Sequence, residues 1–434
     1  MDETLPAPTR RFEAHPHRAA ILGELHARPF LSTETPRVYL HYAFSNVAGA
    51  AVANEAITAL CAAAGLSGPN PQARHHVLNF GGGRLKWERH SEFTTYAWDG
   101  PLDLDARPFG PLPTGHPFGT SFTPPGPLLV AARLDLLPAG EAYQTSLAGF
   151  DPSSLSVADA VDGRATVVTD FLANGDGRIN ILIIDRGLAP NQAGALAQRL
   201  LEVETYRSYA LLALPEAQRV GPEVRRIEES LADITAAIRE SDGLDSNRDL
   251  LGQLSQLTAD LEAGAAASSY RFGASRAYWR IVLDRLGAIG ESPVPGFPTW
   301  SSFLTRRMGP AIRTVEVTEE RQANLSRKLS RAAQLLRTRV DIDLEQQNRD
   351  LLEKMNTRAQ LQLRLQQTVE GLSVAAISYY VIGLLGYLFK AGKEAHLLPV
   401  DPSIATGISV PFVVAFMYWL VGAIRRKHME HGEH

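Results

Sequence analysis

The pattern of apolar and polar positions divides the chain into three parts. Residues 36–188 alternate short β-branched and aromatic runs with an alanine-rich run, which is typical of strands and a helix. Residues 189–300 repeat apolar side chains at helical spacing between turn residues. The remainder is helical and includes two long uncharged runs. The sequence therefore predicts an α+β domain, then a helical bundle, then a very long helix that leads into a two-helix hairpin.

The first part contains the predicted strands, and a Pro-rich surface loop over residues 101–127 interrupts them. A hairpin is expected around Asn174–Gly177, because Asn-Gly and Asp-Gly pairs favour tight turns between strands. Gly81–Gly83 lies between two predicted strands and reads as another turn. The predicted strands are Arg37–Asn46, two or three within His75–Trp98, Leu128–Leu137, Ala165–Leu172 and Ile179–Asp185, with a helix over Ala50–Ala64.

The second part predicts several separate helices. The helix that begins at Ala189 is expected to break at Pro215 and again at Gly221–Pro222, because proline removes a helical hydrogen bond. Segments 223–239 and 244–266 form an expected antiparallel pair that is split at residues 241–243. A further helix is predicted over residues 268–287.

A single long helix is predicted from about Ala311 to Phe389, with a stalk over residues 309–370. Its apolar positions repeat about every 3.6 residues, and residues 311–389 contain no proline. At roughly 1.5 Å per residue such a helix is about 120 Å long. A helix of this length is stable only when it packs, either on the preceding helices or on copies of itself. The stalk thus predicts a homo-oligomer.

The two uncharged runs, residues 371–389 and 404–424, predict membrane spans. Each has about the 20 apolar residues that a helix needs to cross the hydrocarbon core. Arg425, Arg426 and Lys427 begin the tail at residues 425–434, and basic residues favour the cytoplasmic side. Residues 390–403 then form an outer loop. We expect both termini in the cytoplasm, with the lipid bilayer of a bacterial inner membrane as a partner.

Composition narrows the remaining classes of function. A net charge of -4 over 434 residues gives no attraction for nucleic acid. The single cysteine, Cys61, excludes an intrachain disulfide framework and reads as a core residue. Residues 1–35 look irregular to short-helical and contain no apolar leader. No catalytic set, metal-ligand spacing or cofactor motif is visible, so an enzyme, a metal site and a cofactor are not expected.

Two polar constellations are candidate sites in the first two parts. His26 and Arg28 lie two residues apart before a proline. They read either as a helix end or as a site for a cytoplasmic ligand or protein partner, because Arg binds anions and His titrates near neutrality. Glu202, Glu204 and Arg207 share a helix. Glu204 and Arg207 are expected to pair, and the alternative is a carboxylate metal site with Asp185.

One face of the first predicted span combines small and polar residues. If copies surround an axis this face lines it, with Tyr379 as a constriction. Small residues also allow close helix packing with no pore. Glu370, at the inner end, forms either an acidic ring or a water-facing carboxylate. The candidate pore-lining residues are Thr368, Glu370, Ala375, Tyr379, Gly383 and Gly386.

The layout resembles the CorA-type divalent-cation channels, in which a stalk helix continues into the first span. Residues 348–393 occupy the corresponding stalk-to-pore position. The resemblance implies a CorA-like architecture with ion passage. The Gly-Met-Asn triplet of those channels is absent, because residues 386–390 read Gly-Tyr-Leu-Phe-Lys. Lys390 and Lys393 would lie at the outer mouth and disfavour a divalent cation, so magnesium selectivity is not implied.

The chain is more similar to a family of uncharacterised bacterial proteins described as predicted membrane-anchored proteins. This resemblance covers nearly the whole chain, and it implies membrane anchoring without an activity. The segments that carry it are residues 24–30 (ELHARPF), 185–188 (DRGL), 201–207 (LEVETYR), 275–278 (SRAY) and 368–380 (TVEGLSVAAISYY).

Two functions follow as hypotheses. The first is an oligomeric inner-membrane protein that passes a small ion or regulates its passage. The second is a membrane-anchored cytoplasmic scaffold or sensor module that transports nothing.

Overall fold

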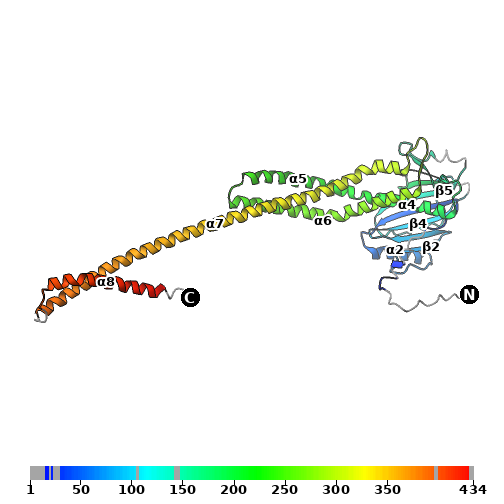
Figure 1. Cartoon of the computed structure of the whole chain (residues 1–434). Coiled ribbons are helices and arrows are strands. Elements are labelled where there is room, and N and C mark those ends of the chain that lie inside the picture. The colour runs from blue at the N-terminus through cyan, green and yellow to red at the C-terminus, as the bar shows by residue number, and fades with distance from the viewer. Residues whose placement is uncertain are drawn as a thin grey trace. The chain divides into compact units, whose positions relative to one another are not determined.

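The computed structural model has a mixed α+β fold (Figure 1) and describes residues 15–18, 21–22, 30–103, 107–140, 147–394 and 399–429. The chain divides into two compact units. Unit 1 consists of residues 1–237 and 252–333, and unit 2 of residues 238–251 and 334–434. The sheet lies in unit 1, and the end of the longest helix lies in unit 2 with the final helix. The two apolar runs therefore lie in unit 2.

The described strands form one nine-stranded sheet in the order β2-β3-β4-β1-β5-β8-β7-β6-β9. Neighbouring strands are antiparallel except β5 and β8, which are parallel. The expected strands and both hairpins are confirmed, while the short strands β6 and β9 were not foreseen. The bounds are β1 Arg37–Ser45, β2 His75–Phe80, β3 Gly83–Arg89, β4 Phe93–Pro101, β5 Leu128–Pro138, β6 Ser156–Ala160, β7 Ala165–Ala173, β8 Ile179–Asp185 and β9 Ser292–Pro293.

Helices cover both faces of the sheet. On one face, helix α4 (Pro190–Leu211) shares a hydrophobic core with the end of α6 and the first turns of α7. On the other face, helix α2 (Ala50–Ala63) packs through Ile57 and Cys61 on Trp87 and Trp98. Cys61 is fully buried, which confirms its expected place in the core. The alternation of side chains along each strand therefore separates two buried layers.

Two long helices replace the several helices that were expected between residues 213 and 289. Helix α5 runs over Ala213–Glu240 with Pro222 inside it, and α6 runs over Leu244–Ile289. The expected break at Gly221–Pro222 is wrong. Pro222 lies beside Gln218 and Gly221 at a surface hollow, where water can reach the backbone carbonyl that a proline leaves without a helical partner. The expected separate helix at 268–287 is also wrong.

The alanine content of α6 explains why it continues through its alanine- and serine-rich middle, where the serine hydroxyls bond within the helix. The Ser268 hydroxyl donates to the Gly264 carbonyl, and the Ser269 hydroxyl donates to the Ala266 carbonyl. Alanine has the strongest intrinsic preference for the helix. The expected split at residues 241–243 is confirmed, because α5 ends at Glu240 and α6 begins at Leu244.

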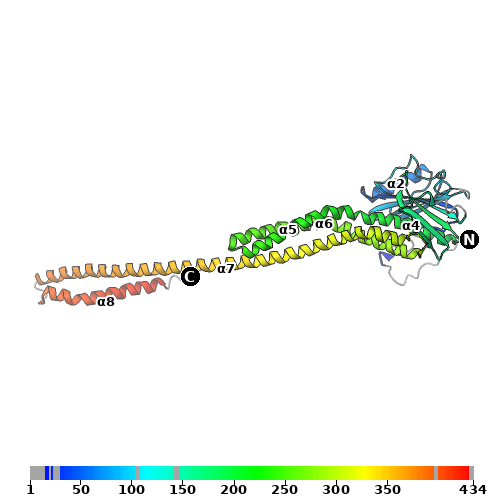
Figure 2. The ribbon, with the colours of Figure 1, turned by 90° about the horizontal axis from the view of Figure 1, so that it is seen from above.

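Helix α7 begins earlier than its sequence suggests and runs over Trp300–Glu394 (Figures 1 and 2). Pro310 lies inside it. The first turns form despite this proline because Trp300, Phe303 and Met308 are buried in the core of unit 1. Tertiary packing thus outweighs the local cost of a proline.

Unit 2 contains the rest of α7, the turn between α5 and α6, and helix α8 (Pro402–Met429). The Arg339 guanidinium donates to the Ile238 carbonyl, and the Asn247 amide donates to Asp343 Oδ2 at 2.8 Å. Further along, α8 lies beside the end of α7 in both views (Figures 1 and 2). Two helices of the described chain, α7 and α8, are long and apolar enough to cross a membrane.

Candidate functional site

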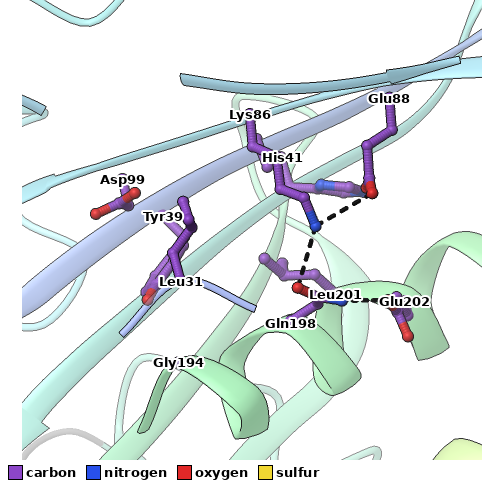
Figure 3. Close-up of a pocket in the computed structure, with 11 residues that line it drawn as sticks. Leu31, Tyr39, His41, Lys86, Glu88, Asp99, Gly194, Gln198, Leu201 and Glu202 are labelled. Atoms are coloured by element: carbon purple, nitrogen blue, oxygen red, sulfur yellow. Dashed lines mark hydrogen bonds and ion pairs between the residues drawn. The ribbon is translucent and has the colours of Figure 1, made fainter. Parts of the chain in front are cut away.

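A small cavity lined by both polar and apolar side chains lies in unit 1 between the sheet and helix α4 (Figure 3). Its volume is about 60 Å³, and a single water needs about 10–15 Å³ measured in this way. The cavity therefore has room for a few waters or one small molecule. It is lined by Leu31, Tyr39, His41, Lys86, Glu88, Ala97, Asp99, Gly194, Gln198, Leu201 and Glu202.

Strand register brings the polar lining residues together. Lys86 on β3 is opposite Ala97 on β4, and Ala97 is opposite His41 on β1. Asp99 is opposite Tyr39 in the same way. Because side chains two residues apart share a face, these residues all project toward α4. Polar side chains thus occupy positions that would carry a hydrophobic layer in an ordinary sheet.

Lys86 is the central cation of the cavity. Its ammonium group donates to Gln198 Oε1 at 3.1 Å and forms an ion pair with Glu88 Oε1, also at 3.1 Å (Figure 3). Gln198 in turn donates to Glu202 at 2.8 Å. Lys86 is 8% exposed, so its charge is largely removed from water. An ammonium group has three hydrogens, and one of them remains for a molecule in the cavity.

His41 is neutral and its tautomer can be assigned. Burial is the main cause that lowers its pKa to about 3, and the charges of Lys86 and His90 lower it further. The Thr205 hydroxyl donates to the Leu201 carbonyl, so it accepts from His41 Nε2 at 2.7 Å. Nδ1 therefore carries a lone pair. It is buried and has no hydrogen-bond partner in the part of the chain that the structure describes.

Two arginines hold Asp99 and close one end of the cavity. Arg37 Nε lies 2.6 Å from Asp99 Oδ2, and Arg84 Nη2 lies 2.9 Å from the same oxygen. Arg84 also donates to the Ser32 carbonyl and to the Thr33 hydroxyl. Asp99 is 3% exposed. This pairing neutralises a buried carboxylate and fixes the segment around Thr33 against the sheet.

The segment before β1 lies directly on α4. A Cβ atom on Gly194 would collide with the Leu31 carbonyl oxygen, so only glycine allows this close approach. The Tyr39 hydroxyl donates to Thr33 Oγ1 at 2.7 Å. Burial raises the pKa of Tyr39 to about 12, and its hydroxyl remains protonated. The sheet, the helix and residues 31–33 thus form the walls of the cavity.

The predicted carboxylate residues of α4 are placed mainly as ion pairs. Arg207 Nη2 lies 2.6 Å from Glu204 Oε1, which confirms the expected pair. Glu202 lines the cavity and pairs with Arg285. Asp185 instead accepts from the backbone amides of Gly187 and Leu188 at 2.7 Å and holds the turn before α4. The described residues contain no group of three or more His, Cys, Asp or Glu side chains that could hold a metal ion.

The structure separates the predicted pore-lining residues into two groups. Thr368, Ala375, Tyr379 and Gly383 are exposed on α7. Gly386 lies against Thr406 of α8, where a Cβ atom would be 3.4 Å from the threonine hydroxyl. Helix α8 therefore partly covers Gly386 and leaves the other four uncovered.

The ends of the predicted spans carry the charged candidates. Glu370 is partly exposed and lines a hollow between α7 and α8 together with Gln367 and Tyr418. Lys390 is exposed, and Lys393 Nζ lies 3.4 Å from Asp401. His26 and Arg28 lie outside the described residues.

Sequence reasoning missed Lys86, His41 and Asp99 as a group. One signal was available in the strand Arg84–Arg89, where Arg84, Lys86 and Glu88 alternate with Leu85 and Trp87. That alternation predicts one polar face, and a polar face ordinarily points to solvent. Only the tertiary position of α4 shows that this face is buried.

Comparison with known proteins places the chain in a family. A family model described as "Protein of unknown function (DUF3422)" matches residues 13–428. The chain belongs to this family. No curated protein and no solved structure matches it.

Two of the segments that carry the family resemblance, residues 201–207 and 185–188, lie at the cavity or beside it. Leu201–Arg207 contributes Leu201 and Glu202 to the lining and Thr205 to the contact with His41. Asp185–Leu188 forms the turn that starts α4, and Asp185 also accepts from the Thr35 hydroxyl at 2.5 Å. Both segments therefore shape the region between the sheet and α4.

Proposed function

We propose that this DUF3422 protein is a membrane-anchored ligand-binding module. The α+β unit lies in the cytoplasm and binds a small polar molecule in the cavity under α4. Helix α7 links this unit to a two-span hairpin made from its own end and α8. The observation that carries the proposal is the continuity of α7, which begins in the core of unit 1 at Trp300 and includes the apolar run at residues 371–389.

The core gives a physical route from the cavity to α7. Leu200 and Leu201 of α4 share one hydrophobic cluster with Trp300 and Leu304 of α7. Closely packed interiors transmit small displacements because they contain few voids. A ligand that shifts α4 therefore shifts the first turns of α7. A helix without a break carries such a shift along its axis.

Side-chain exposure supports the placement of the hairpin in a membrane. Tyr379, Leu384 and Phe412 are 76%, 65% and 72% exposed, and many apolar neighbours on α7 and α8 are exposed as well. A water-soluble protein rarely exposes a contiguous apolar surface of this extent. Lipid removes the apolar surface from water, and the basic residues after residue 424 favour a cytoplasmic C-terminus.

The free hydrogen-bonding groups define the ligand. Lys86 offers one N–H donor, and the partly exposed Glu88 carboxylate offers an acceptor. The ligand therefore combines an acceptor with a donor in a few heavy atoms. Glycine and acetamide satisfy this requirement, whereas inorganic phosphate brings a high negative charge beside Glu88 and Asp99.

Thermal unfolding of the full-length protein in nanodiscs tests the ligand site. We expect millimolar glycine or acetamide to raise Tm, and phosphate to leave it unchanged. Lys86→Met should abolish the rise, and Gln198→Met should weaken it. Lys328→Met, at an exposed lysine of α7, serves as the matched control. The proposal fails if neither probe raises Tm, or if the Lys86 variant responds as the unaltered protein does.

Ion passage is a second candidate, and the exposure of one α7 face favours it. Thr368, Tyr379 and Gly383 remain uncovered in a single chain, so a ring of hairpins would bring them around a common axis. This arrangement is the one that the likeness to CorA-type channels implies. Glu370 would lie at the inner end of the path, and its carboxylates would attract cations.

Flux measurements separate passage from anchoring alone. Vesicles that contain the protein should release potassium faster than empty vesicles, and Tyr379→Ala or Glu370→Gln should change the rate. Tyr380→Ala is the matched control, because Tyr380 is similarly exposed but lies about 100° further around the helix. Release equal to that of empty vesicles would leave an anchored scaffold or sensor without transport.

A further inference from the structure

One apolar face of α7 is covered near residue 340 and uncovered beyond it. Leu336 and Val340 are 0% and 9% exposed beside the turn between α5 and α6. Leu351, Leu365 and Leu372 continue the same face, and they are 57%, 66% and 68% exposed. The described part of the chain thus leaves about seven turns of helix without a neighbour on their apolar side.

The boundaries of the uncovered stretch are set by two contacts. At one end, the hydrogen bond from Asn247 to Asp343 joins the turn between α5 and α6 to α7. At the other end, the hollow shared by Glu370, Tyr418 and Val421 marks where α8 reaches α7. Between residues 344 and 369 the described chain leaves the apolar side chains of α7 facing open space.

The uncovered face has a seven-residue repeat. Leu344, Leu351, Arg358, Leu365, Leu372, Tyr379 and Gly386 follow at intervals of seven. Asn348, Met355, Gln362, Val369, Ala376 and Gly383 form a second series, each four residues after a member of the first. These are the d and a positions of a heptad repeat. We call the two series together the α7 seam.

We propose that the α7 seam binds a second copy of this chain, parallel and in register. The inference rests on the proposed membrane insertion. Identical hairpins inserted in one membrane hold their stalks in the same direction, so each residue of the seam lies beside the same residue of its neighbour. The membrane also raises the local concentration of copies. A heptad seam is self-complementary in this arrangement, because knobs from one helix fit holes of an identical helix.

Polar seam positions fix the register. Asn348 and Gln362 lie at a positions, where buried amides pair with their own copies and disfavour a shifted alignment. The f positions, which lie directly opposite the seam, are polar, as Glu353 and Gln360 show. The distribution of polar residues thus distinguishes an inner from an outer face of the stalk.

The width of the apolar face indicates more than two copies. Leu352 and Leu361 flank the seam on opposite sides and are 65% and 58% exposed. The a/d seam of a coiled-coil pair is narrower than the apolar stripe of about 100° on a core-facing helix, and these flanking leucines widen the face beyond such a seam. Each helix therefore contacts two neighbours, and a ring of three or more copies satisfies both flanks. The ring also surrounds Tyr379 and Gly383 in the apolar segment.

Disulfide crosslinking in native membranes tests the seam directly. In a Cys61→Ala background, Leu351→Cys and Leu365→Cys place single thiols on the seam, while Glu353→Cys and Gln360→Cys place them on the opposite face. Copper phenanthroline should convert most of each seam variant to dimers joined at identical positions. The two controls should give at least tenfold less product. Co-expression of two differently tagged copies shows that both partners are this chain.

Crosslinking between two different cysteine positions tests whether the copies are aligned in register. A tagged Leu351→Cys copy should not crosslink to a Leu365→Cys copy with a different tag, because the two positions lie about 20 Å apart along the helix. Equal crosslinking at seam and control positions overturns the proposal, and so does the absence of dimers or a product that contains another protein. Ligand binding in the cavity is measured separately on the same variants, so loss of the seam leaves the proposed binding function intact.

Discussion

His41 Nε2 lies 2.7 Å from Thr205 Oγ1, and this contact joins the central strand β1 to helix α4 across 164 residues of sequence. The contact requires a neutral imidazole that donates from Nε2, because the threonine hydroxyl already donates to Leu201. The cavity is thus built around a histidine that burial holds in one protonation state.

The stability of the protein should fall between pH 7 and pH 5 because of His41. Its pKa is about 3 in the folded protein and about 6.5 in the unfolded chain. Above pH 6.5 neither state is protonated. As the pH falls below 6.5 the unfolded state binds a proton and the folded state does not, so the free energy of unfolding falls, by about 2 kcal/mol at pH 5. Below pH 3 no further loss arises from this group.

Urea unfolding of the full-length protein in detergent, followed by tryptophan fluorescence, checks this pH dependence. Four of the five tryptophans lie in unit 1, so the signal reports mainly on that unit. His41→Gln keeps a donor for Thr205 and does not titrate. The variant should lose about 2 kcal/mol less than the unaltered protein between pH 7 and pH 5. Equal losses in the two proteins would show that His41 does not resist protonation.

Removal of the Asp99 charge should destabilise unit 1. Asp99→Asn leaves the Arg37 and Arg84 guanidinium groups facing a neutral amide in a largely buried site. We expect a loss of about 2–3 kcal/mol, which is below the cost of breaking a fully buried pair because both arginines retain some contact with water.

The matched control for Asp99 is Asp176→Asn. The Asp176 side chain is 67% exposed and pairs with Arg178 in a hairpin turn, so its loss should change stability by at most about 0.5 kcal/mol. Both variants are compared by the same urea titration at pH 7. A loss for Asp99→Asn as small as that of the control would mean that the buried ion-pair cluster does not hold the end of the cavity.

Arg358→Leu should tighten the association of copies. Arg358 occupies a d position of the α7 seam between Leu351 and Leu365. In a parallel assembly this position brings like charges together, and the side chains must turn outward to reach water. Leucine removes the repulsion and fills the seam. We expect the concentration at which copies dissociate in mild detergent to fall at least tenfold.

The control for Arg358 is Arg349→Leu, which removes an exposed arginine that pairs with Glu345 outside the seam. Dilution of labelled protein, followed by fluorescence energy transfer between copies, measures dissociation in each case. Equal dissociation for Arg358→Leu and the unaltered protein would place the contact between copies on another face.

Local patterns predicted most of the elements and little of the cavity. The strand Arg37–Ser45 and the hairpin turn at Asn174–Gly177 follow from β-branched runs and turn residues, which act within a few positions. Pro222 and Pro310 misled the prediction of helix ends, because the packing of α5 and α7 outweighs a local cost. The cavity depends on the register of three strands and on the position of α4. A local sequence pattern predicts neither of these features.

For the long helix, too, the local sequence predicted one feature and missed another that depends on packing. Its continuity into the apolar run was predicted from the absence of helix breakers, and α7 confirms it. The seven-residue series was not recognised from the sequence. The apolar repeat near 3.6 was taken over the whole helix, which combines residues that pack within the chain with residues that remain exposed. Burial of Leu336 and exposure of Leu365 separate the two sets.

The mass and symmetry of the full-length protein in nanodiscs test the central claim most directly, namely that copies assemble around α7 in a membrane. One chain has a mass of 47.3 kDa. Light scattering followed by imaging should give three or more copies arranged around an axis that runs along α7. A single copy, or a pair without such an axis, would contradict the account.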